Sequence, residues 1–238
     1  MRQVTINIST IRHFSFDLWL TLIKSNPLFK ESRAHYFYTK FNKKNKSLQE
    51  IRHIFQKVDV LCNAMNEKTG KNISAEEMYL MVIYQVNEST ELFKDIDLDL
   101  LYSQMELLVL EYMPEIFCHQ TLEILDRIKC KPGVTLNILS NTAFIKGSTL
   151  KKVNKHLGIS KYFDFEIYSD EVGLSKPSIK IYNRLIENIL NIRCDRIGLE
   201  QIVHVGDNYH ADILGAQKAG ISSFQINTTQ QSITHLLN

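Results

Sequence analysis

The sequence predicts an α/β protein with a Rossmann-like core of five parallel strands and an all-helical domain inserted after the first strand. One observation is the distribution of glycine, which tight turns between strands and helices need. Of nine glycines, only Gly70 lies before residue 130. A second observation is that short β-branched runs alternate with helical patterns from residue 115 onward, as in a parallel sheet. We therefore expect an α/β core of residues 1–23 and 113–238 and a helical domain of residues 24–112.

The first expected strand ends at Asp17, within the apolar string FSFDLWLTL of residues 14–22. Four helices should follow, because apolar residues then recur at spacings of three and four. Ser47 with Glu50 and Ser74 with Glu77 have the pattern of a capping box, which predicts the starts of the second and third helices. The expected helices are residues 28–43, residues 47–66, a helix that opens after Ser74, and residues 97–113.

The second half of the chain should complete the sheet. Four more strands are expected there, and a helix precedes or follows each of them, which is the signature of parallel connections. The expected strands are residues 135–140, 164–168, 202–206 and 222–226. The expected helices are residues 116–129, 146–157, 178–192 and 211–219.

Composition excludes several classes of protein. The net charge of +2 is too small for a dedicated binder of nucleic acid or of anionic membranes. The four cysteines are scattered without a C-x-x-C pair, so neither a disulfide framework nor a zinc site is indicated. Asp17 and Lys24 interrupt the apolar stretch near the amino terminus, which predicts neither a signal peptide nor a membrane span. We expect a cytoplasmic protein.

Polar residues that suit phosphate chemistry follow the expected strands. In an open α/β sheet, such residues meet in one crevice at the carboxyl ends of the strands. They are Asp17, Ser140 and Asn141 in LNILSN, Lys176 in GLSKPS, and Asp207 and Asp212 in VHVGDNYHAD. A carboxylate approaches a phosphate dianion only if cations offset the repulsion, and Mg²⁺ together with a lysine can supply that charge. Carboxylate oxygens are also the hard ligands that Mg²⁺ prefers.

These four strings, in this order and spacing, resemble the motifs of the haloacid dehalogenase-like (HAD) hydrolase superfamily. The helical insertion is similar to the α-helical cap that members carry after the first core strand. The resemblance implies that Asp17 is a nucleophile that forms a covalent intermediate and that Lys176 neutralises charge on it. It implies that Thr21 and Ser140 bond the nucleophile or the phosphate, with help from the backbone amide of Asn141. The implied Mg²⁺ ligands are Asp17, Asp207, Asp212 and the backbone carbonyl of Trp19.

Trp19 departs from the pattern of phosphatases in this superfamily, which usually carry a second aspartate two residues after the nucleophile. That aspartate protonates the leaving group, and indole has no proton that titrates near neutral pH. Losing a general acid–base typically costs about 10²–10⁴ in rate. The loss is milder for acyl phosphates, pyrophosphates and aryl phosphates. Trp19 either stacks on substrate or fills the cleft beneath the cap, and the sequence favours the second role slightly.

Three other readings of Trp19 stay open. Haloacid dehalogenases carry an aromatic residue at this position and use no metal, although their fourth motif lacks the aspartates of GDNYHAD. Phosphonatases use a Schiff-base lysine in the cap, for which Lys30 and Lys57 are candidates. The third reading is that Trp19 marks a scaffold, which binds a phosphorylated ligand or partner without turnover. The leading prediction is a Mg²⁺-dependent hydrolase of a small phosphorylated molecule.

A few further residues bear on specificity. Arg33 and Tyr36 lie in the first expected helix and share one face, and an exposed helical surface is the favoured interpretation for both. His204 lies within a strand that should be buried, which indicates a structural role. His210 should be exposed.

Overall fold

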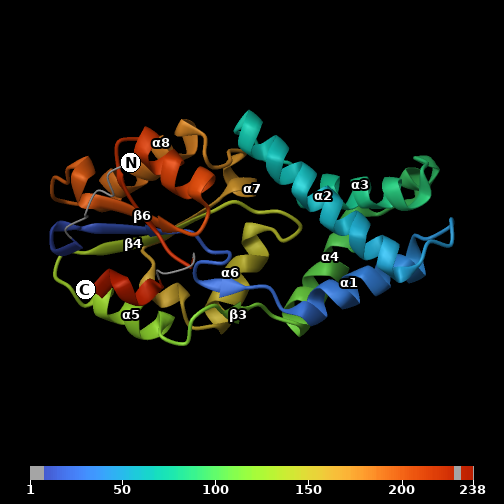
Figure 1. Ribbon diagram of the computed structural model, residues 1–238, viewed down its shortest axis with the longest axis horizontal. Coiled ribbons are helices and arrows are strands. Elements are labelled where there is room, and N and C mark those ends of the chain that lie inside the picture. The colour runs from blue at the N-terminus through green and yellow to red at the C-terminus, as the bar shows by residue number, and fades with distance from the viewer. Residues whose placement is uncertain (1–7, 228–231, 238) are drawn as a thin grey trace.

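The computed structural model describes residues 8–227 and 232–237, and a five-stranded parallel sheet lies in one half of it (Figure 1). The strand order is β5-β4-β1-β6-β7. The strands are β1 (His13–Phe16), β4 (Thr135–Ser140), β5 (Phe165–Tyr168), β6 (Ile202–Gly206) and β7 (Ser222–Gln225). At the end of β1, Phe16 is in register with Ile138 on one side and Val205 on the other. The predicted fold class is confirmed.

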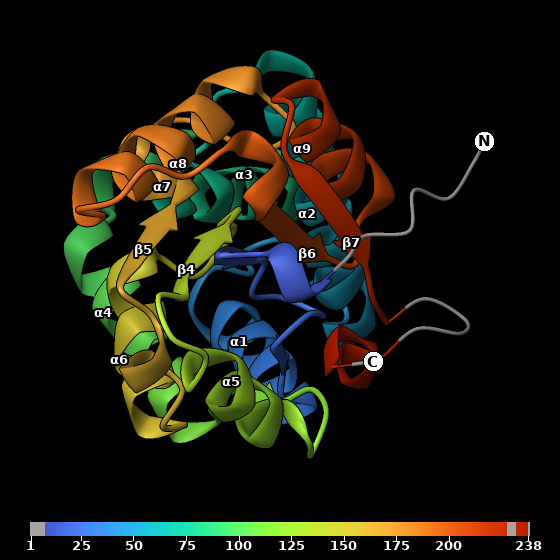
Figure 2. The same cartoon turned by 90° about the vertical axis from the view of Figure 1, so that its left-hand side faces the viewer.

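Helices cover both faces of this sheet (Figure 2). On one side lie α5 (Thr121–Lys129) and α6 (Gly147–His156), which pack on an apolar face that includes Phe14 and Phe16. On the other side lie α8 (Ile179–Ile192) and α9 (Gly215–Lys218), packed against Leu139, Ile167 and Ile202. This second face also buries four polar side chains on the central strands, His13, Ser15, Asn137 and His204. His204 on this polar face contacts Asp212, one of the site residues.

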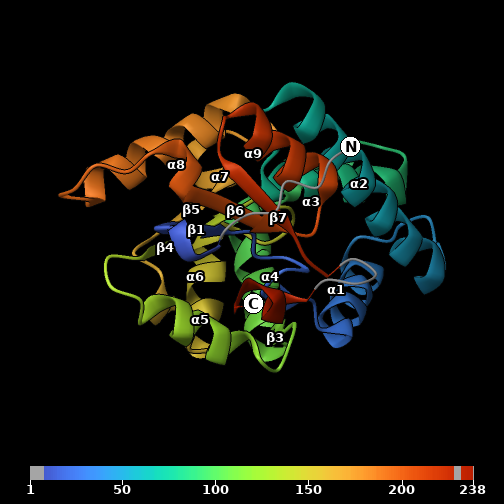
Figure 3. The same ribbon diagram turned by 60° about the vertical axis from the view of Figure 1, so that its left-hand side comes forward.

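Residues 24–112, which we call the helical segment, contain four longer helices gathered at one end of the molecule (Figures 1 and 3). They are α1 (Pro27–Lys40), α2 (Leu48–Thr69), α3 (Ala75–Asn87) and α4 (Leu98–Glu111). The capping boxes at Ser47 and Ser74 form as predicted. These helices bury a second apolar cluster, with Phe37, Phe55 and Tyr79 at its centre, and Phe144 of the core also belongs to it.

Hydrogen bonds join the helical segment to the core on the side of α6. The Tyr79 hydroxyl donates to the carbonyl of Phe144 at 3.0 Å, and the Tyr102 hydroxyl accepts from the backbone N–H of Lys146 at 2.8 Å. Gly70 packs so closely on Ser178 that a Cβ would lie 2.8 Å from the serine Cβ, and its positive φ of 69° also favours glycine. The loop after β4 is therefore held between the two parts of the chain.

The structure corrects three predicted elements. The helix expected from residue 116 begins at Thr121, because residues Glu115–Ile116 form β3, which pairs antiparallel with β2 (Ile23–Lys24). The helix expected over 211–219 is instead a π-helical turn, Tyr209–Leu214, followed by α9. A short helix that was not predicted, α7 (Ser169–Val172), follows β5 directly.

Short 3₁₀ turns complete the described chain: Ile8–Thr10, Glu91–Asp95, Ser160–Tyr162, Leu199–Gln201 and Ile233–Leu237. Within the residues that the structure describes, we find no helix with the length and apolar character needed to cross a membrane.

Candidate active site

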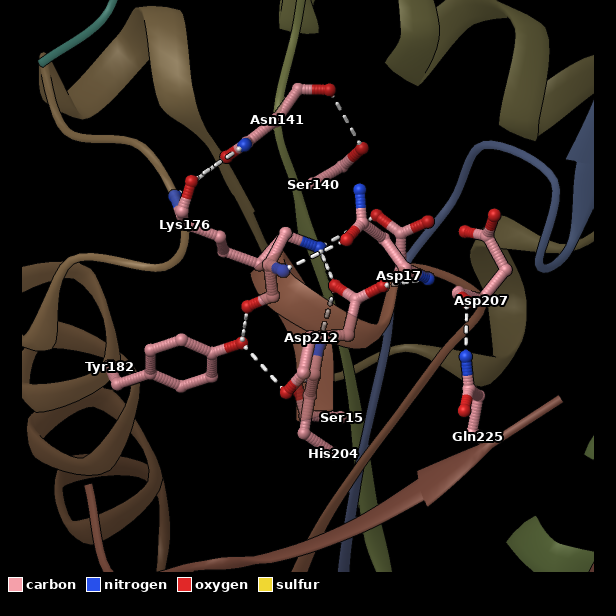
Figure 4. Close-up of polar contacts among 12 residues, drawn as sticks. Ser15, Asp17, Ser140, Asn141, Lys176, Tyr182, His204, Asp207, Asp212 and Gln225 are labelled. Atoms are coloured by element: carbon pink, nitrogen blue, oxygen red, sulfur yellow. Dashed lines mark hydrogen bonds and ion pairs between the residues drawn. The ribbon is translucent and has the colours of Figure 1, made fainter. Parts of the chain in front are cut away.

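Lys176 lies at the centre of the site and contacts two carboxylates (Figure 4). Its side chain is 2% exposed, and its ammonium donates to Asp17 Oδ1 at 2.7 Å and to Asp212 Oδ1 at 2.6 Å. Asp17 follows β1 directly, and its backbone N–H donates to the carbonyl of Val205 at 2.8 Å. The ends of neighbouring strands thus bring together residues that lie far apart in the sequence.

Asp207 joins this pair of carboxylates. One oxygen from each of Asp17, Asp207 and Asp212 lies within 4.8 Å of the other two. Three carboxylates around one ammonium leave an excess of negative charge in a largely buried place, which favours binding of a further cation. Carboxylate oxygens gathered in this way could hold Mg²⁺, which binds such oxygens at about 2.1 Å.

Burial and mutual repulsion shift the pKa values of these groups. Burial, with the charge of Asp212, raises the pKa of Asp17 to about 7, although Lys176 opposes the shift. Burial and Asp212 also raise the pKa of Asp207. At Asp212 burial acts in the same direction, but Lys176 and His204 outweigh it and lower the pKa. Burial lowers the pKa of Lys176, yet the two carboxylates together raise it above its ordinary value.

A layer of buried groups holds the carboxylate of Asp212. His204 lies 3.2 Å from its Oδ1 and bonds Ser15 Oγ at 2.9 Å through the other ring nitrogen. The backbone N–H of Asn208 donates to Oδ2 at 3.0 Å. A Cβ on Gly206 would lie 2.2 Å from that Oδ2, so only glycine leaves room for the carboxylate. His204 is buried, as the sequence indicated, but its bond to Asp212 was not predicted.

Asn141 positions the lysine. Its side-chain amide donates to the backbone carbonyl of Lys176 at 3.0 Å, and its carbonyl oxygen accepts from the backbone N–H of Lys176 at 2.8 Å. This pair of bonds fastens the loop that carries Lys176 to the end of β4. Sequence reasoning assigned Asn141 only its backbone amide, because a contact between residues so far apart leaves no local pattern.

Two predicted residues lie outside the group around Lys176. Thr21 Oγ1 is buried and has no hydrogen-bond partner among the described residues, so it does not bond Asp17. Ser140 is fully buried, and its hydroxyl donates to the carbonyl of Asn141 at 3.2 Å. The phosphate contacts expected for both hydroxyls remain predictions.

A pocket of about 400 Å³ opens above the carboxylates. Its floor includes Asp17, Lys176, Asp207 and Asp212, and Trp19 lies on its wall. Trp19 is half-buried and also packs against the apolar core, so it both fills space and faces the pocket. The helical segment supplies the opposite wall, with Phe29, Lys30, Arg33, Asp59, Asn63 and Glu67.

The structure contradicts the interpretation of Arg33 as exposed surface. Its side chain is buried and faces this pocket. Tyr36, in contrast, is half-buried and packs beside the apolar cluster of the helical segment. Lys57 is exposed and does not line the pocket, whereas Lys30 does. His210 is exposed as predicted and pairs with Glu67 at 3.2 Å.

Comparison with known sequences decides the family. A sequence model of haloacid dehalogenase-like hydrolases matches residues 11–220. The chain belongs to this family. It is 38% identical over 98 residues to a glyceraldehyde 3-phosphate phosphatase of Methanothermobacter thermautotrophicus, a match that covers 40% of this chain and 38% of that protein. It is 36% identical over 81 residues to a pyrimidine 5′-nucleotidase of Escherichia coli, which covers 34% of each. The matched segments therefore span well under half of these relatives.

Solved HAD structures share the fold over most of the chain. The protein YfnB of Bacillus subtilis, in a structure bound to magnesium, superposes with a TM-score of 0.67 at 17% identity, covering 93% of this chain and 91% of that one. A 2-haloacid dehalogenase of Pseudomonas syringae superposes with a TM-score of 0.62 at 18% identity, covering 93% and 89%. At such identities the likeness concerns the fold alone.

Proposed function

We propose that this HAD hydrolase is a Mg²⁺-dependent phosphohydrolase that acts on a small phosphorylated molecule through an aspartyl-phosphate on Asp17. The observation that carries the proposal is the contact of Asp17 with Lys176, together with the nearby aspartates. One carboxylate oxygen of Asp17 lies within 4.8 Å of an oxygen of Asp207 and of Asp212. The names of the two curated relatives, both phosphatases of small phosphorylated compounds, support the same reaction class. The helical segment is proposed to act as a cap over the pocket, since it forms one of its walls.

Asp17, Asp207 and Asp212, with the backbone carbonyl of Trp19, would hold the ion. Mg²⁺ at that position supplies positive charge that lets an anionic carboxylate approach a phosphate. Asp17 then forms a bond to phosphorus while the bond from phosphorus to the leaving oxygen breaks. Lys176, already bonded to Asp17, stays beside the transferring group and stabilises its charge. Water then attacks phosphorus and releases Asp17.

Trp19 sets the choice of leaving group. No carboxylate occupies its position, so an alkoxide would leave without receiving a proton from that residue. An acyl phosphate releases a carboxylate, which needs none. We therefore propose that the wild type favours acyl and aryl phosphates over alkyl phosphates.

Acetyl phosphate is the substrate that tests this function most directly. Its hydrolysis should require Mg²⁺ and should be lost in Asp17→Asn. Asp207→Ala should lose Mg²⁺ binding by calorimetry, whereas Asp126→Asn, a change at an exposed position of α5, should not. Equal Mg²⁺ affinity in wild type and Asp207→Ala would contradict the proposal.

A metal-free dehalogenase is the second candidate, and the aromatic Trp19 is the observation that favours it. It predicts chloride release from 2-chloropropionate without Mg²⁺ and no phosphate release. Binding of phosphorylated ligands without release of either product would indicate a scaffold instead.

A further inference from the structure

Arg33 is a buried cation in the wall of the pocket. The residue is 8% exposed, and its guanidinium carbon lies 4.2 Å from the ring centre of Phe55, 4.5 Å from Phe144 and 5.1 Å from Phe29. These rings come from α2, from the loop after β4 and from α1, so the guanidinium lies where the helical segment meets the core. It lines the same pocket as Asp17.

No carboxylate among the described residues contacts the guanidinium of Arg33 directly. None of the ion pairs within the described residues includes it, and its Nε has no hydrogen-bond partner there. The Tyr79 hydroxyl interacts with Arg33 as a hydrogen-bond partner but carries no charge, and Asp59 attracts Arg33 without coming within ion-pair distance. Aromatic faces recover part of the cost of burying a cation, but a buried charge is ordinarily paired.

We propose that Arg33 binds a second anionic group of the substrate, a carboxylate, so that the substrate class is a short phosphorylated carboxylic acid. The proposal rests on the proposed function, because it places the phosphate at Asp17. A guanidinium presents two parallel donors that match the two oxygens of a carboxylate or a phosphate. Asp59 and Glu67 line the same pocket, and they repel a doubly charged group more than a singly charged one. The geometry therefore favours a carboxylate over a second phosphate.

The size of the pocket agrees with a short molecule. Its volume of about 400 Å³ lies near the lower end of the range for small-ligand sites. In the proposed complex, the ligand would lie between the carboxylates, which the core supplies, and Arg33, which the helical segment supplies.

Two ligands with the same carbon chain test the proposal. 3-Phosphoglycerate and glycerol 3-phosphate share the phosphate and differ at the far carbon, which is a carboxylate in one and a hydroxymethyl group in the other. Calorimetry with Mg²⁺ measures the affinity of each, and phosphate release is followed in the same samples. Losing one partner of a buried charged pair typically weakens binding substantially, so we expect about 30-fold tighter binding of 3-phosphoglycerate.

Four variants assign that preference to particular side chains. Arg33→Met should reduce the preference for 3-phosphoglycerate to less than about threefold. Arg33→Lys keeps the charge but lacks the paired donors of the guanidinium, so it should restore part of that preference. Asp59→Asn should strengthen binding of 3-phosphoglycerate, because it removes a competing negative charge. Lys57→Met changes an exposed lysine on the same helix as Asp59 and should leave the preference as it is.

The outcomes separate this proposal from the proposed function. If the wild type does not hydrolyse acetyl phosphate, the proposed function is overturned. The affinities for 3-phosphoglycerate and glycerol 3-phosphate would still test the role of Arg33. Equal affinity of the wild type for both ligands, or a preference that survives in folded Arg33→Met, would show that Arg33 only packs against its aromatic neighbours. The gain expected for Asp59→Asn keeps the test decisive if Arg33→Met fails to fold.

Discussion

Replacing Lys176 by methionine tests the electrostatics of the site, because methionine keeps the length of the side chain and removes its charge. Lys176 is 2% exposed and its two carboxylate partners are at most 9% exposed. Removing one member of a buried ion pair costs about 3–5 kcal/mol, since the remaining charge stays buried without a partner. Without Mg²⁺, we expect the free energy of unfolding to fall by about that amount.

Mg²⁺ should return part of this stability. An ion at 100 times its dissociation constant stabilises the folded state by about 2.7 kcal/mol. The variant should bind Mg²⁺ more tightly than the wild type, because Lys176 no longer competes for Asp17 and Asp212. Acetyl phosphate turnover should nevertheless fall by about 10²–10³, the usual effect of removing one stabilising donor.

Lys151→Met is the matched control. Lys151 contacts Glu171 at 2.6 and 2.9 Å, distances close to those of Lys176, but its side chain is 47% exposed. An exposed pair contributes about 0–1 kcal/mol. Urea unfolding of both variants, with and without Mg²⁺, measures the difference. If Lys176→Met lost no more stability than Lys151→Met in the absence of Mg²⁺, the charge argument would be refuted.

Three other changes probe separate features. Trp19→Asp should raise hydrolysis of an alkyl phosphate by some part of the roughly 10²–10⁴ that a general acid contributes. A wild type that already cleaves alkyl phosphates rapidly, with no gain in the folded variant, would mean that another group donates the proton. Gly206→Ala should weaken Mg²⁺ binding by about 10–100-fold, because the new Cβ would displace the carboxylate of Asp212; unchanged calorimetry would contradict this. Burial lowers the pKa of His13 from 6.5 to about 4, so below pH 6.5 the unfolded chain binds a proton that the folded chain does not. Stability should therefore fall by about 2 kcal/mol from pH 7 to pH 5, and urea titrations of His13→Gln should lack that part of the slope.

The elements with strong local signals could be predicted from the sequence. Strands β4 and β6 have the predicted bounds, 135–140 and 202–206, and both capping boxes form. The misses occurred where tertiary contacts decide the backbone. Strand β3 exists only because it pairs with β2, which lies on the far side of the helical segment. The close packing of the Tyr182 ring on Gly215, next to the π-helical turn, also depends on a distant residue.

The site residues also differ in whether local sequence or distant contacts determine their positions. Parallel strands end at one edge of a sheet, so the meeting of Asp17 with Asp207 and Asp212 could be predicted once the strands were identified. Lys176 reaches them from a loop beyond α7 rather than from the end of a strand. The burial of Arg33 could not be predicted, because it depends on Phe144, which comes from a different part of the chain. Asn141 and His204 likewise gained their roles through contacts that periodicity and composition do not encode.

The pairing of β2 with β3 has a consequence for how the chain folds. Lys24 lies opposite Glu115, so two backbones meet where the helical segment leaves and rejoins the core. Closing a flexible loop of about 90 residues costs about 4 kcal/mol in chain entropy, and the pairing of β1 with β4 has to close a loop that contains the same residues. Helices that assemble from local contacts shorten this loop before the sheet forms. We therefore expect the transition state for folding to contain the α1–α2 pair, with φ-values there above those of β1, and any change that loosens that pair to slow folding of the distant sheet.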